Sequence, residues 1–355
     1  MKTLFIEGVT QAGLESYLTA RQYDALYWPT FFPLKDVNTL DGKTLIGSEG
    51  SRVAAHVISY NSKAPEAGRK AVSLKYFDIP KIAQSRRKSE SEILEHQITK
   101  ALRGIDAVVE DYFNDIDFVF DSAQARMEWY ALQALSTTKL QLTTTNNPQG
   151  IVNETVLDFG MATANKKTVS VIWSTGNVAT MDPIADFKAV VKAARALGIT
   201  FSKCLMTSDT YDLMTAATLF KAYFTNALSI VVPMSLEAIN TLLRSYKLPE
   251  IVLIDTSLGI EAKSGAITAT NPWSTTHITF IPDVKCGNMY NGPIAEQIEK
   301  PDGVILSKKS NVSLSIRRES NPVSVLTKAE CNVFPSWPTI DRCFSLYTAH
   351  ASTWA

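Results

Sequence analysis

The sequence lacks an excess of charge of either sign. Its 355 residues carry 35 Lys and Arg against 35 Asp and Glu. A dedicated nucleic-acid-binding protein usually shows a clear basic excess, so the composition argues against that class. It leaves room for weak contact between one face of the protein and a nucleic acid.

Cysteine is scarce, and its spacing excludes a zinc motif. No C-x-x-C pair occurs among the four cysteines, which are Cys204, Cys286, Cys331 and Cys343. Isolated cysteines of this kind are typical of small, reduced side chains in a core. We expect that state here, as in a protein that assembles in a reducing cytosol.

Long hydrophobic runs are also absent. No stretch reaches the roughly 18 apolar residues that a membrane-spanning helix needs, and Glu7 interrupts the first apolar residues too early for a signal peptide. We therefore expect neither a membrane span nor a secretion signal. Apolar residues still make up 45% of the chain, enough for one elaborate domain or two compact ones.

Catalytic motifs are missing as well. The histidines are scattered along the chain as His56, His96, His277 and His350. Neither G-x-S-x-G nor G-x-G-x-x-G occurs. We expect no catalytic, cofactor-binding or metal-binding residue, and no enzymatic activity.

Two local patterns resemble binding motifs without completing them. Gly42-Lys43-Thr44 looks like the end of a phosphate-binding loop, but Val37 stands where that loop needs its first glycine. We interpret it as a turn before a strand. A set of acids has no loop of oxygen ligands around it, so we interpret it as a solvated or interface face: Glu110, Asp111, Asp115, Asp117 and Asp121.

What the sequence does contain is one long amphipathic helix, expected to start near Ser89 or Ser91 and to end near Ser136-Thr137-Thr138. Its start is marked by a capping box, in which Ser89 is followed three residues later by Glu92. Apolar residues recur in steps of three and four over about 50 Å of helix. They are Ile98, Leu102, Ile105, Val109, Tyr112, Ile116, Val119, Ala123, Met127, Tyr130 and Ala134. A rod of this length favours a protein that tiles a surface.

The segments before this helix look like arms. The aromatic and proline-rich residues 27–33 are too interrupted for a regular helix and too apolar for water, so they dock on their own domain or on a neighbour. Candidate strands at 53–59 and 71–77 flank a turn-rich stretch and predict an extended hairpin. A lone hairpin is only marginally stable, so we expect it to lie on another surface.

Charge reverses sign between the hairpin and the helix. Residues 51–90 hold nine Lys or Arg against three acids, whereas residues 91–128 hold three against nine. The two segments can pair within one chain or between neighbouring chains, and the sequence leaves both open. Such pairs set orientation and register more than affinity.

The rest of the chain changes its pattern of expected secondary structure from segment to segment. A second hairpin is expected from 140–144 and 152–159, followed by an α/β region and a strand-rich return. The expected helices of that region are 182–196, 210–223 and 235–246, with strands at 168–173, 204–207, 251–255, 265–270 and 276–281. The return strands are expected at 304–306, 312–318, 323–331 and 343–347.

This order of parts resembles the major capsid protein of tailed bacteriophages, in particular the lambda-type capsid E family with its Hong Kong ninety-seven-like fold. Local phrases in the same order support the resemblance. They are Tyr76-Phe77-Asp78-Ile79-Pro80-Lys81-Ile82, Asp182-Pro183-Ile184-Ala185-Asp186 after Trp173, Phe280-Ile281-Pro282, Gly287-Asn288-Met289-Tyr290-Asn291-Gly292, Val325-Leu326-Thr327 and Pro335-Ser336-Trp337-Pro338.

The resemblance implies an α+β fold with four parts. Residues 1–38 would form an N-terminal arm and 39–88 an extended β-hairpin loop. A peripheral domain would combine 89–179 with 301–340 and contain the spine helix 93–136, with Gly104 as a candidate flex point. An α/β axial domain would combine 180–300 with 341–355.

The implied function is self-assembly into hexamers and pentamers of an icosahedral shell around a double-stranded DNA genome. The implied partners are the chain itself, scaffolding, portal and decoration proteins, and packaged DNA bound without sequence preference. The protein would belong to the virion and assemble in the bacterial host cytoplasm, with no membrane partner. Three alternatives stay open: an encapsulin-like nanocompartment shell protein, an α/β enzyme with a helical oligomerisation spine, and a tail or baseplate structural protein.

Overall fold

The computed structural model describes residues 11–21, 25–46, 73–103, 105–150, 156–224, 235–351, 353 and 354. The chain divides into two compact units, each assembled from three separate segments. Unit 1 comprises residues 1–42, 76–129 and 288–336, and unit 2 comprises residues 43–75, 130–287 and 337–355. The mixture of helices with largely antiparallel strands confirms the expected α+β class.

Unit 1 is built on a six-stranded sheet with the order β1-β13-β16-β15-β14, in which β4 also pairs with β16. The long strand β16 (Val323–Ser336) organises it, pairing with β15 and β4 along most of its length and with β13 at its end. Among the described strands of this sheet, only β1 and β13 pair in parallel. The other strands are β1 (Leu34–Asp36), β4 (Lys81–Lys88), β13 (Asn288–Asn291), β14 (Val304–Lys309) and β15 (Val312–Ser320).

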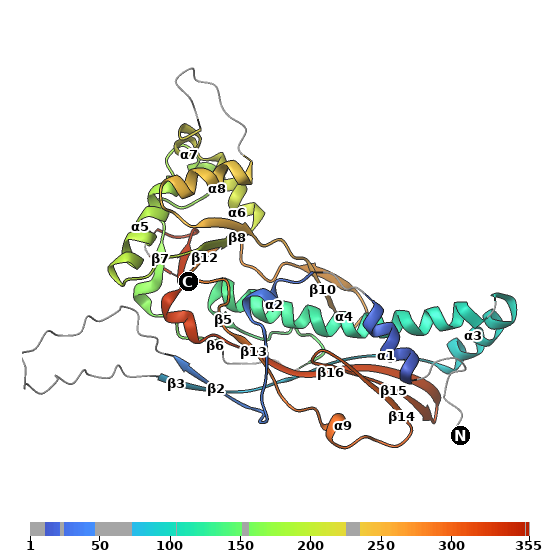
Figure 1. Ribbon diagram of the computed structural model, residues 1–355. Coiled ribbons are helices and arrows are strands. Elements are labelled where there is room, and N and C mark those ends of the chain that lie inside the picture. Colours follow the sequence, from blue (N-terminus) through green and yellow to red (C-terminus); the bar gives the residue numbers. More distant parts are fainter. Residues whose placement is uncertain are drawn as a thin grey trace, which may run out of the picture. The chain divides into compact units, whose positions relative to one another are not determined.

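The expected spine helix is present as two helical spans, α3 (Glu90–Arg103) and α4 (Ile105–Thr137), of which α4 is the long one (Figure 1). Gly104 lies outside the described residues. The start agrees with the capping box, because the Ser89 backbone N–H donates to the Glu92 carboxylate at 2.7 Å. Residues of α4 up to Trp129 belong to unit 1, and those from Tyr130 belong to unit 2.

The apolar stripe of this helix is buried along α4. Its buried members are Ile116, Val119, Ala123, Met127, Tyr130 and Ala134. Ile98, the first residue of the expected stripe, is instead exposed on α3. The stripe is therefore buried at its described α4 positions and exposed at Ile98 of α3.

The arm contains two helical elements that the sequence analysis missed. They are α1 (Gln11–Ala20) and the single turn α2 (Trp28–Phe31). Pro29 is accommodated in α2 because it occupies the first turn, where its missing N–H costs no intrahelical hydrogen bond. Trp28, Phe31 and Phe32 are all buried, so this segment docks on its own chain.

Unit 2 contains a five-stranded sheet with the order β7-β17-β12-β8-β9. β12 (His277–Ile281) is antiparallel to both of its neighbours, whereas the outer pairs β7–β17 and β8–β9 are parallel. The other strands are β7 (Lys166–Thr168), β8 (Lys203–Met206), β9 (Glu250–Leu253) and β17 (Phe344–Tyr347). A strand expected at 168–173 therefore ends at Thr168. Beyond it, Ser170 and Trp173 turn to bind the Asp186 carboxylate.

The helices of unit 2 begin where the sequence indicates. Asp182, Thr207 and Ser235 accept hydrogen bonds from backbone N–H groups at the starts of their helices, as N-cap residues do. The helices are α5 (Pro183–Ala196), α6 (Ser208–Ala216), α7 (Thr218–Ala222) and α8 (Leu236–Ser245). The single helix expected at 210–223 is thus two, because the chain leaves the helix at Ala217 and the Thr218 N–H bonds the Val178 carbonyl.

The core of unit 2 is rich in aromatic rings. Phe280 of β12 lies edge-to-face with Phe187 of α5, with 5.3 Å between ring centroids. Phe201 contacts both Phe280 and Phe344. These rings fix α5 to the face of the sheet opposite that of Thr279, whose hydroxyl bonds the Leu135 carbonyl at the end of α4.

The described residues also form three two-stranded ribbons. β2 (Asp41–Ile46) pairs with β3 (Ser73–Asp78), β5 (Lys139–Leu140) with β6 (Leu157–Asp158), and β10 (Leu258–Glu261) with β11 (Ile267–Thr270). The pair β5–β6 confirms the second hairpin in shorter form. The strand expected at 53–59 lies outside the described residues. Short helical turns occupy Thr163–Asn165, Thr175–Asn177, Ala295–Ile298 (α9) and Pro338–Arg342.

Candidate assembly surfaces

The arm is fastened to the spine helix by one buried carboxylate. Glu128 of α4 accepts the backbone N–H groups of Tyr27 and Trp28 at 3.0 and 2.8 Å. Its side chain thereby satisfies donors at the start of α2 that no helical carbonyl can reach. Burial raises the pKa of Glu128, and the two hydrogen bonds oppose that effect. The alternative that this segment docks on a neighbour is thus unnecessary.

A second carboxylate of α4 holds α1. Asp117 accepts the Tyr17 hydroxyl at 2.7 Å and lies 3.3 Å from the Arg21 guanidinium. Burial, together with the hydrogen bond to Asp117, raises the pKa of Tyr17 to about 12. The α1 segment of the arm therefore contacts the acidic side of the spine helix.

The basic strand β4 pairs with the acidic helix within one chain. Asp115 lies 3.4 Å from both the Arg86 guanidinium and the Lys88 amine. The Arg86 guanidinium also lies 3.6 Å from the centroid of the Phe118 ring. For these residues the contact is intramolecular, and the interpretation of Asp115 as a solvated or interface acid was wrong. The side chains of Glu110 and Asp111 lie outside what the structure describes.

A four-residue ion network crosses the unit 1 sheet. Glu330 of β16 lies 2.8 Å from the Lys81 amine and 2.7 Å from the Lys328 amine, and Lys328 also binds Glu296. Burial acts to raise the pKa of Glu330, but the two lysines outweigh it and the pKa is lowered. The network connects β4, β16 and α9, so it fixes the strand on which the extended loop ends.

The first helix of the spine presents an apolar ridge. Leu94 and Ile98 are each 61% exposed, and their spacing of four residues places them on one helical face. The neighbouring exposed positions are largely acidic, namely Glu90, Glu92 and Glu95. An exposed apolar pair with a polar rim is typical of a protein contact surface.

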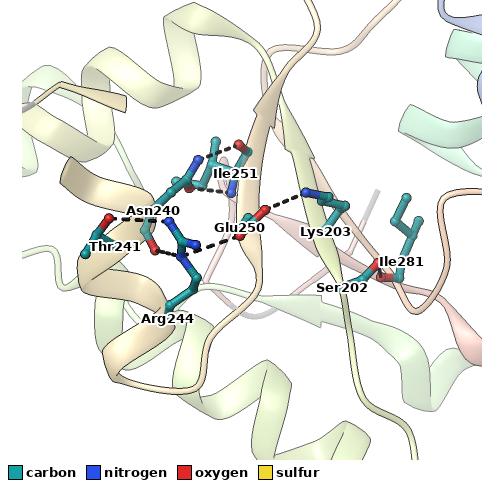
Figure 2. Close-up of polar contacts among 8 residues, drawn as sticks. All are labelled: Ser202, Lys203, Asn240, Thr241, Arg244, Glu250, Ile251 and Ile281. Atoms are coloured by element: carbon teal, nitrogen blue, oxygen red, sulfur yellow. Dashed lines mark hydrogen bonds and ion pairs between the residues drawn. The ribbon is translucent and has the colours of Figure 1, made fainter. Parts of the chain in front are cut away.

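The open edge of the unit 2 sheet is covered by a side chain. Asn240 of α8 donates to the Ile251 carbonyl at 3.1 Å and accepts the Ile251 N–H at 2.7 Å (Figure 2). The amide therefore occupies the place of a neighbouring strand along β9. Unpaired edge groups invite pairing with another chain, and here the fold itself occupies those of Ile251.

Charges beside this edge are paired with one another. Glu250 lies between Lys203 of β8 and Arg244 of α8, 3.5 Å from the latter (Figure 2). The hydrogen bond from Lys203, with its positive charge, lowers the pKa of Glu250. Glu250 is therefore occupied by these two cations.

His277 is buried in an aromatic cluster. Its ring lies 4.8 Å from that of Tyr347 and 5.3 Å from that of Trp354, between centroids. Its Nδ1 is 2.9 Å from the Ser274 hydroxyl. Burial, with the charge of Lys139, lowers the pKa of His277 to about 4, so this imidazole is neutral near pH 7 and anchors Trp354 by packing.

The other residues weighed from the sequence lie apart from one another. His56 and the side chain of His96 lie outside what is described, and His350 accepts the Thr353 N–H. Gly42-Lys43-Thr44 lies inside β2, so its interpretation as a turn was wrong. All four cysteines are free and buried, as expected.

The described residues contain neither a metal-binding cluster nor a membrane-spanning helix. They hold no group of three His, Cys, Asp or Glu placed to bind a metal ion. Among the same residues, every helix is too short or too polar to cross a membrane.

The order of parts, with arm, basic strand, spine helix, α/β unit and return strands, is matched by one protein family. The phage major capsid protein E family matches residues 22–347. The chain belongs to this family. It is therefore a major capsid protein, a virion component that self-assembles into an icosahedral shell.

One similar solved structure supports the fold, and two others align with the chain over most of its length. A proposed prophage capsid protein from Escherichia coli CFT073 aligns with a TM-score of 0.54 at 14% identity, covering 96% of this chain and 99% of that one. A phage-related protein from Bordetella bronchiseptica RB50 gives 0.48 at 14% identity, covering 95% and 96%. The capsid protein of cyanophage A-1(L) gives 0.47 at 10% identity, covering 93% and 94%. No curated protein matches the capsid chain.

Proposed function

We propose that this capsid protein forms hexamers and pentamers through head-to-tail contacts, and that these rings close into a shell around the double-stranded DNA genome of a tailed bacteriophage. The family match over residues 22–347 carries the proposal. Head-to-tail contacts between copies of one chain close into rings when the rotation between subunits fits. The protein acts by binding itself and has no enzymatic role in this proposal.

The parts of the chain then take the roles of a capsid subunit. In this proposal residues 89–179 and 301–340 form the peripheral domain, and 180–300 with 341–355 form the axial domain that meets at the capsomer centre. This division differs from the two compact units at residues 130–179, 288–300 and 337–340. Residues 1–38 are the arm and 39–88 the extended loop. The buried carboxylates of α4 support the first role, because they hold the arm and β4 against the spine.

Assembly requires further partners in this proposal. Scaffolding and portal proteins shape the precursor shell, decoration proteins bind outside it, and assembly takes place in the host cytoplasm. Four free, buried cysteines fit a reducing compartment. The balance of 35 basic and 35 acidic residues suits a container that contacts DNA without gripping it.

The apolar ridge of α3 supplies a subunit contact. The double variant L94E/I98E places two carboxylates on that ridge, where desolvation in a contact would oppose them. We expect soluble, folded subunits that no longer form rings or shells. The comparison variant I298E alters a single exposed isoleucine on α9 and should assemble normally. If L94E/I98E formed shells at the wild-type yield, the ridge would not be part of a subunit interface.

Electron microscopy of the purified chain, with light scattering, tests the proposed function. Closed particles of tens of nanometres, or rings of five and six, would support it. Particles that enclose an enzyme and no DNA would identify a nanocompartment shell. A chain that stays small after a candidate scaffolding protein is added would contradict the capsid assembly described above.

A further inference from the structure

The outward face of α5 carries cations and no acid. Its exposed residues are Ala185, Lys188, Ala189, Lys192, Arg195 and Ala196. The three cations are four and three residues apart, so they form one row along the helix. The two acids near the helix start have other partners, because Asp182 caps it and Asp186 is buried against Ser170 and Trp173.

The same basic surface continues onto the end of α8. The Arg195 guanidinium donates to the Lys247 carbonyl at 3.2 Å. The Lys188 amine lies 4.6 Å from the ring centroid of Tyr246 and 5.8 Å from that of Tyr223. The two tyrosine rings meet edge-to-face at 5.5 Å. We call this surface the α5 stripe, made of Lys188, Lys192, Arg195, Lys247, Tyr223 and Tyr246.

No carboxylate neutralises the stripe within the described part of the chain. Its four cations form no ion pair there, and Glu250 is already held by Lys203 and Arg244 (Figure 2). Like charges at these helical spacings repel and weaken the helix, and an external polyanion would relieve that repulsion.

We propose that the α5 stripe binds the phosphate backbone of packaged double-stranded DNA. The inference rests on the proposed function and assigns one surface to the DNA contact. The row of cations is about 10 Å long and lies on a convex helix face, which offers no groove for reading bases. Duplex DNA presents one negative charge per about 1.7 Å of its axis, so the row meets phosphates in any register.

The stripe can contact DNA phosphates at any position along the duplex. This property favours DNA over an acidic protein segment as the partner. Subunits in a shell are placed by the symmetry of the shell, which does not follow the DNA helix. A contact that tolerates every register suits that situation. An acidic peptide would instead need carboxylates spaced to match the stripe.

The salt dependence of DNA binding tests the assignment. The variant K188Q/K192Q/R195Q removes three charges and keeps residues with good helix propensity. The matched control K263Q/K285Q/K300Q removes three exposed lysines elsewhere. Fluorescence anisotropy with a random DNA duplex, from about 50 to 200 mM salt, gives the slope of log affinity against log salt.

We expect the stripe variant to reduce that slope by about 2–3 and the control to leave it unchanged. The single variant K192Q should reduce it by about 1, which keeps the test decisive if the triple variant does not fold. Equal slopes for all proteins would overturn the proposal. So would unchanged DNA binding combined with lost binding to polyglutamate, which would identify an acidic protein as the partner.

Microscopy of the same variants separates this inference from the proposed function. The stripe variant should still close into shells, because the stripe is assigned to DNA and to no subunit contact. If the stripe variant formed normal shells and its slope of log DNA affinity against log salt were unchanged, the DNA-binding role of the stripe would be refuted and the capsid assembly would stand. Failure of the wild-type chain to form shells even after a candidate scaffolding protein is added would refute the capsid assembly and leave the measured slope as a separate result.

Discussion

At the residue scale, unit 1 depends on acids of α4 and β16 that are turned away from water. Glu128 holds the arm, Asp115 holds β4, and Glu330 lies between two lysines. Each carboxylate is satisfied by donors from a segment distant in sequence. The acidity of this region is therefore a feature of its internal contacts as much as of its surface.

The variant E128A should lower the free energy of unfolding by about 2–4 kcal/mol. It removes two hydrogen bonds to a charged acceptor and leaves the N–H groups of Tyr27 and Trp28 without that partner. Urea denaturation provides the measurement. The control E95A, on the exposed face of α3, should change the same free energy by less than about 0.5 kcal/mol. Equal effects would mean that Glu128 does not anchor the arm.

Glu330 should make the fold sensitive to acid. Its pKa is lowered in the folded state, so its ion pairs contribute fully above the ordinary carboxyl pKa of about 4.3. That contribution is lost as the pH falls through the lowered pKa. The variant E330Q should be less stable by about 2 kcal/mol at neutral pH, and the difference should shrink below pH of about 4.

Denaturation at several pH values measures that difference. The exposed Glu299 lies in the same unit, and E299Q should follow the wild type at every pH. A constant gap between E330Q and the wild type would show that no proton is linked to the Glu330 pairs.

At the scale of elements, Asn240 determines how the edge strand β9 ends the sheet. The variant N240D keeps an acceptor for the Ile251 N–H but places a carboxylate against the Ile251 carbonyl, and N240L removes both bonds. We expect losses of about 1–3 kcal/mol in each. In N240L the Ile251 amide should exchange with solvent faster by more than the global change in stability explains. Unchanged local exchange would exclude the edge-covering role.

Elements with local signals were predictable from the sequence. The helix α5 begins at the Asp182 cap and ends before Gly198, whose φ of 72° favours glycine. The strands β14, β15 and β16 begin at their expected residues, but each extends beyond its expected end, and β16 continues to Ser336. The break between α6 and α7 was missed, because it depends on a bond from Thr218 to Val178 that no local pattern encodes.

For the contacts of the arm and of β4 with α4, the sequence predicted the distribution of charge and not the individual residue pairs. The reversal of sign between 51–90 and 91–128 indicates that basic and acidic segments pair, but it does not identify Asp115 as the partner of Arg86. Glu128 carried one overlooked signal, since an acid between the buried Met127 and Trp129 has to find donors inside the fold. Asn240 and Glu330 carried none, because their partners come from other elements.

At the scale of the whole molecule, the two units are interleaved along the chain. The chain passes from one unit to the other after residues 42, 75, 129, 287 and 336. The last of these segments supplies β17, which lies inside the unit 2 sheet between β7 and β12. Neither unit is therefore a separable stretch of sequence.

A chain ended after Ser336 should lose the fold of unit 2, because removal of β17 leaves β7 without a partner and breaks the sheet. A chain ended after Thr348 keeps β17 and loses Trp354, so it should fold with lower stability. Circular dichroism and limited proteolysis distinguish the two. Comparable protection of both chains would contradict the central place of β17.

The position of β17 also governs how the subunit is made. A ribosome produces β7 and β12 first, and β17 follows only after every other strand of the sheet has been synthesised. Until then both flanking strands have unpaired edges, which are templates for aggregation. The order of synthesis therefore leaves the facing edges of β7 and β12 open until the last segment of the chain has been made.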